Sequence, residues 1–119
     1  MDIRDREILE LVRRTLTPEQ TERSLVYWDK RVRPAGARIQ LGPETFPMPF
    51  EGTIVFVDLA PRANWAHPCL YILVETRTLA TKVLEASLPP NMDESPETFI
   101  ILLRYGQKPP HDRCFNAFG

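Results

Sequence analysis

The chain has 119 residues, of which 43% are hydrophobic and 26% charged, and its formal net charge is -1. Chains of roughly 100–150 residues with such a composition usually fold around one core, so we expect a single domain over residues 1–119, with a loosely ordered tail over 107–119. The balanced charge excludes the strongly basic class of nucleic-acid binders, and no apolar run approaches the ~20 residues of a membrane span.

The N-terminal part of the chain predicts two helices in succession. Apolar residues recur at helical spacing over residues 2–16, and Asp5 places a negative charge in the first turn. The sequence Thr-Pro-Glu-Gln over residues 17–20 then predicts a second helix start. Thr17 can cap this helix, the proline suits the first helical position, and Gln20 can complete a capping box.

A strand, a turn and a proline-rich connection follow. Residues 25–33 suit either a continuation of the second helix or a strand. We favour a strand, because the sequence Arg-Pro-Ala-Gly over 33–36 places proline and glycine where a tight turn needs them. We therefore expect residues 37–41 to form the strand that returns alongside 25–33. Three prolines interrupt residues 42–51, which predicts an irregular connection rather than a paired strand. The apolar face of this connection is expected to consist of Phe46, Met48 and Phe50.

Three later segments predict the strands of a buried sheet. They are residues 53–59, 70–75 and 99–105, all rich in apolar and β-branched residues, and the first is apolar on both faces, as a central strand is. Residues 78–88 suit either a helix or a hairpin strand. The whole pattern predicts an α+β fold, in which an N-terminal helical segment packs on a mainly antiparallel β-sheet.

The connection between the two strongest strand segments is the first candidate binding site. Its nine residues, 60–68, exceed the two to five of a usual hairpin loop, and long loops on rigid strands often carry binding groups. Tryptophan and arginine are common anchors at interfaces, although a loop tryptophan can also fold back over the core. The side chains expected to bind a partner are those of Arg62, Asn64, Trp65 and His67.

The second candidate site comes from the two histidines and two cysteines, which occur in pairs as His-Pro-Cys and His-Asp-Arg-Cys. If the tail lies beside residues 70–75, the four side chains can converge in a tetrahedral zinc site. The spacings are not those of a common zinc finger, and the alternatives are a disulfide, a reactive thiol or no joint role. The expected metal ligands are His67, Cys69, His111 and Cys114.

The sequence lacks the motifs of common enzyme classes: a glycine-rich phosphate loop, Gly-x-Ser-x-Gly and His-Glu-x-x-His. We therefore expect a small, soluble, non-catalytic binding or regulatory module without a cofactor, which contacts a protein or small-molecule partner through residues 60–68. The alternative is a metal-binding or thiol-dependent protein built on the His/Cys pairs, with zinc as the cofactor.

A weaker alternative is a small-molecule pocket between helix and sheet, roofed by residues 60–68 and about 300 Å³ or more in volume. The charged N-terminus lacks the apolar stretch of a signal peptide, so we expect a cytoplasmic protein with neither nucleic acid nor membrane as a partner.

Overall fold

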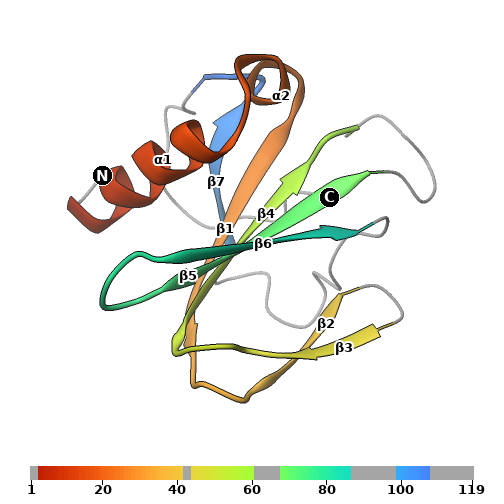
Figure 1. The fold of residues 1–119 in the computed structure, drawn as a ribbon. Coiled ribbons are helices and arrows are strands. Elements are labelled where there is room, and N and C mark those ends of the chain that lie inside the picture. The colour runs from red at the N-terminus through yellow and green to blue at the C-terminus, as the bar shows by residue number, and fades with distance from the viewer. Residues whose placement is uncertain (1–2, 42–43, 61–67, 87–98, 108–119) are drawn as a thin grey trace.

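The computed structural model describes residues 3–41, 44–60, 68–86 and 99–107, which form two helices and seven strands (Figure 1). No helix in these ranges is long and apolar enough to cross a membrane. The elements, in chain order, are α1 (Ile3–Thr15), α2 (Pro18–Arg23), β1 (Leu25–Arg33), β2 (Arg38–Leu41), β3 (Glu44–Pro47), β4 (Gly52–Asp58), β5 (Cys69–Glu75), β6 (Thr81–Ala86) and β7 (Phe99–Arg104).

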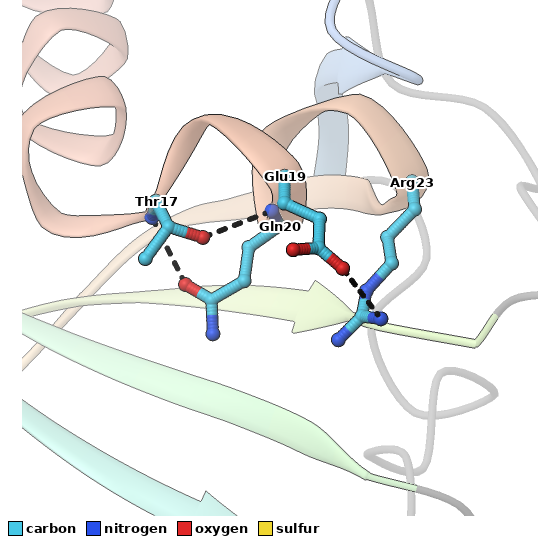
Figure 2. Close-up of polar contacts among 4 residues, drawn as sticks. All are labelled: Thr17, Glu19, Gln20 and Arg23. Carbon is cyan, nitrogen blue, oxygen red and sulfur yellow. Dashed lines mark hydrogen bonds and ion pairs between the residues drawn. The ribbon is translucent and has the colours of Figure 1, made fainter.

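The start of α2 confirms the predicted capping box (Figure 2). The backbone N–H of Gln20 donates to the Thr17 hydroxyl at 3.1 Å, and the Gln20 side-chain oxygen accepts from the Thr17 backbone N–H at 3.0 Å. These two bonds satisfy donors that the first turn of a helix leaves without partners. Glu19, in the first turn, pairs with Arg23, in the last turn of the same helix, at 3.7 Å.

Five strands form one antiparallel sheet in the order β6-β5-β4-β1-β7. The prediction that residues 53–59 form a central strand is confirmed, because β4 is the middle strand and all seven of its residues are buried. The open question over residues 78–88 is answered by β6, which is a hairpin strand paired with β5 rather than a helix. Together with α1, this sheet confirms the predicted α+β fold.

The predicted partner of the second strand is wrong. Gly36 does adopt a left-handed backbone (φ 84°) in the turn after β1, yet β2 pairs with β3 and not with β1. Both sides of β1 are already occupied, by β4 and by β7. The expectation that residues 42–51 form an irregular connection without strand pairing is also wrong in part. Within this stretch, the four residues of β3 pair with β2. The apolar side chains of this stretch do pack on the body, and Met48 is buried.

The sheet separates two apolar clusters, and each lies under a different cover (Figure 1). We call the two sides the helix face and the hairpin face. On the helix face, α1 buries its apolar side against alternate residues of the strands, as the predicted amphipathic pattern requires. On the hairpin face, Ile39 from β2 and Met48 after β3 pack against the other set of strand residues. Members of the helix face include Val26, Trp28, Val55, Val57, Ile72 and Val74, and members of the hairpin face include Tyr27, Ile54, Phe56, Tyr71, Leu73 and Ile101.

The chain bends where β1 leaves its regular ladder with β4, between Asp29 and Arg33. The carboxylate of Asp29 is fully buried, accepts the backbone N–H of Arg31 at 3.0 Å and pairs with the Arg33 guanidinium at 2.9 Å. Opposite this bend, Gly52 lies so close to β5 that a Cβ there would overlap the Val74 carbonyl oxygen. The bend is therefore built from a buried ion pair and a position that only glycine fits.

Candidate functional site

Most of the side chains that the sequence singled out lie outside the described residues. This applies to the predicted binding residues and to three of the four predicted metal ligands: Arg62, Asn64, Trp65, His67, His111 and Cys114. The exception is Cys69, the first residue of β5, which is 1% exposed and carries a thiol. Within the described part of the chain, no group of three or more His, Cys, Asp or Glu residues is placed to hold a metal ion. The zinc site stays a prediction.

The base of the predicted binding loop is held firmly on both sides. Asp58 ends β4 and is paired across the ladder with Cys69, which begins β5. The Asp58 carboxylate is 5% exposed and accepts the backbone N–H of Ala60 at 3.0 Å. An aspartate that bonds the backbone two residues further on forms a local turn. The chain therefore leaves the sheet at Ala60 in a fixed direction and rejoins it beside the same strand.

Below this base, a row of three aromatic side chains crosses β1, β4 and β5 on the hairpin face. The rings of Tyr27 and Phe56 are stacked at 5.8 Å between centroids, and those of Phe56 and Tyr71 are tilted at 5.3 Å. Burial, reinforced by the Asp58 charge, raises the pKa of Tyr27 to about 12, and burial also raises the pKa of Tyr71. Both phenols therefore stay protonated near neutral pH and are poorly suited to act as bases.

A pocket opens on the other side of the sheet, beneath the first two turns of α1. Its volume is about 180 Å³, it is partly enclosed, and its floor is mostly apolar. The residues that line it come from α1, β1, β4, β5 and the turn between β5 and β6: Arg4, Ile8, Trp28, Lys30, Val32, Thr53, Val74, Thr76 and Leu79.

Polar contacts fix two walls of the pocket. The Trp28 indole N–H donates to the Thr53 hydroxyl at 3.0 Å, and this bond ties the ring to the neighbouring strand. The Lys30 ammonium lies over the same ring, 5.5 Å from its centroid, and 3.5 Å from the carboxylate of Asp5. Another part of the lining is fixed by the Arg4 guanidinium, which donates to the Thr76 carbonyl at 3.2 Å. The pocket thus has a rigid aromatic wall and two cations at its rim.

The sequence did not predict this pocket, which lies at the end of β4 and β5 where Thr53 and Val74 face α1. The cavity expected from the sequence has residues 60–68 as its roof; because 61–67 lie outside the described residues, that cavity stays a prediction. A weak signal was present in the sequence, because Trp28 and Lys30 are two residues apart and therefore share one face of a strand. The other walls are brought together only by the tertiary fold.

The chain gave no match when compared with protein-family models, with curated proteins and with solved structures.

Proposed function

We propose that the protein is a non-catalytic binding module, and that the pocket beneath α1 is its ligand site. The observation that carries the proposal is the partly enclosed cavity of about 180 Å³ with a fixed Trp28 wall. An apolar cavity of about 150 Å³ is large enough to take up benzene. The pocket therefore suits one ring or one branched aliphatic group, with Ile8, Val74 and Leu79 as its apolar contacts.

The test uses a small neutral probe, fluorobenzene, observed by ¹⁹F NMR. Few heavy atoms make few contacts, so we expect saturable binding with a Kd on the order of 1 mM. The blocking variant is Val32→Trp, because Val32 lines the pocket and is 49% exposed, so a larger side chain can cover the opening without entering the core. This variant should weaken binding at least about tenfold.

The matched control is Val83→Trp on β6. Val83 is 43% exposed, also lies on a strand and is not part of the pocket, so its replacement should leave fluorobenzene binding unchanged. Absence of saturable binding to the wild-type chain, or equal binding by the two variants, would contradict the proposal.

A second candidate function is supported by the base of the 60–68 loop. Because the Asp58–Ala60 bond and the β4–β5 ladder fix both ends, we propose that this loop presents Arg62 and Trp65 to a partner protein. A photoreactive amino acid at position 65 should then cross-link to a partner in cell extract. The control places the same group at Tyr105, an aromatic position that is 41% exposed. Equal cross-linking yields from the two positions would contradict the loop as a specific surface.

A further inference from the structure

The rim of the α1 pocket carries more positive than negative charge. Lys30 has an acidic partner, Asp5, whose side chain is only 4% exposed and lies 3.5 Å from the ammonium group. Arg4 is held by the Thr76 carbonyl and has no carboxylate partner among the described residues. A guanidinium has five N–H donors, so Arg4 keeps several of them for another acceptor.

A neutral polar group of the pocket adds to this donor character. The Thr53 hydroxyl accepts the indole N–H, so its own hydrogen is available to a further acceptor. Thr76 also lines the pocket, and its backbone carbonyl is the group that holds Arg4 at the rim.

These features define the chemistry of the ligand: an apolar group for the floor and an anion for the rim. The small volume limits the apolar part to about one ring or a branched chain of similar size. A planar carboxylate matches the guanidinium of Arg4, which can donate two parallel N–H bonds to it. Lys30, although paired with Asp5, contributes a second positive charge to the lining of the pocket.

We propose that the α1 pocket binds a small organic monocarboxylate, with its ring or branched chain against Trp28 and Ile8 and its carboxylate at Arg4 and Lys30. This inference rests on the proposed ligand site but goes further, because it names the class of ligand and the residue that selects it. Arg4 is the selecting residue, since of the two cations that line the pocket it is the one with no carboxylate partner among the described residues.

The test compares two probes of nearly equal shape, 4-fluorobenzoate and its neutral analogue 4-fluorobenzamide, by ¹⁹F NMR on the full-length chain. The indole N–H signal of Trp28, assigned with Trp28→Phe, reports whether each probe enters the pocket. We expect the wild-type chain to bind 4-fluorobenzoate about three- to fivefold more tightly than the amide, as a partly solvated ion pair allows.

The decisive variant is Arg4→Gln, which should remove this preference by weakening the binding of the carboxylate more than that of the amide. Its matched control is Arg13→Gln, the same substitution on the same helix, at a 44% exposed side chain that does not line the pocket. Circular dichroism and urea unfolding of both variants check that each remains folded.

Each outcome has a distinct meaning. Loss of the carboxylate preference in Arg4→Gln alone supports the inference. Equal affinities of the wild-type chain for both probes, or equal loss in Arg4→Gln and Arg13→Gln, overturn it while the pocket remains a ligand site. If neither these probes nor fluorobenzene shifts the Trp28 signal, the inference and the proposed function are both wrong.

Discussion

The two faces of the sheet bury their polar groups in different ways. On the hairpin face, the aromatic rings of Tyr27, Phe56 and Tyr71 pack one against another, and the phenols are protonated and almost fully buried. On the helix face, the indole N–H of Trp28 donates to the Thr53 hydroxyl, and the ring borders a pocket with two cations at its rim. Side chains on adjacent strands fill a face row by row, whereas a helix laid over a sheet leaves space where its first turns meet the strand ends.

The largest expected difference between the faces is in the stability lost when one buried isoleucine on each face is replaced by alanine. Ile101→Ala on the hairpin face should cost about 4 kcal/mol, because it creates a cavity among packed side chains. Ile8→Ala should cost about 2 kcal/mol, since the deleted atoms border an existing pocket and alanine favours the helix. Urea unfolding of both variants measures the two values. Equal losses would show that the helix face is packed as tightly at Ile8 as the hairpin face is at Ile101.

The next largest effect is the pH dependence of stability that follows from the buried phenol of Tyr27 on the hairpin face. The pKa of Tyr27 is about 12 in the folded chain against 10 for an ordinary tyrosine, so the unfolded state loses its proton first as the pH rises. The contribution of protonated Tyr27 to the free energy of unfolding is therefore fully present below pH 10. As the pH approaches 12, the free energy of unfolding falls by about 2 kcal/mol.

The reference for this measurement is Tyr27→Phe, which lacks the phenol hydroxyl and therefore does not titrate at this position. The free energy of unfolding of the wild-type chain minus that of Tyr27→Phe, measured by urea unfolding from pH 9 to pH 12, should fall by about 2 kcal/mol as the pH rises. A difference that stays constant over this range would contradict the burial of the phenol.

A smaller effect concerns the polar contact on the helix face. Trp28→Phe removes the bond to Thr53 and the ring area beneath Lys30, and we expect a loss of about 1.5 kcal/mol. A double-mutant cycle with Thr53→Val isolates the bond itself, with a coupling of about 1 kcal/mol. Additive losses in the two single variants would mean that the indole N–H is satisfied equally well by water.

The smallest effect serves as a baseline, because α2 has no buried residues and belongs to neither face. Thr17→Ala removes the side-chain half of the capping box in Figure 2 and should cost about 1 kcal/mol. Thr21→Ala is the control on the same helix, since its hydroxyl only bonds back to the Thr17 carbonyl. If thermal unfolding shows the two variants to be equally stable, the cap contributes nothing measurable.

Local signals in the sequence were sufficient for the elements but not for all of their partners. The cap at Thr17, the turn at Gly36 and the central position of β4 follow from propensity and patterning, and the structure agrees with each. The partner of β2 could not be predicted in this way. A turn sequence specifies that the chain reverses, whereas the choice of partner depends on which strand edges are already occupied.

The candidate pocket was still harder to anticipate, because its walls are far apart in the chain. Arg4 and Thr76 meet across 72 positions, and their contact depends on how α1 crosses the sheet. Asp5 shows the same limit: its place in the first helical turn was predicted, yet its burial against Lys30 was not. Periodicity identifies which side of an element is apolar, and it carries no information about which element will cover that side.

The close approach at Gly52 has an evolutionary consequence. Any other residue there would push a side-chain carbon into the backbone of β5, so the β1–β4 bend and the β4–β5 ladder could not both persist. Divergent descendants of this fold can exchange almost every apolar residue for another of similar size, but they should keep a glycine at this one place.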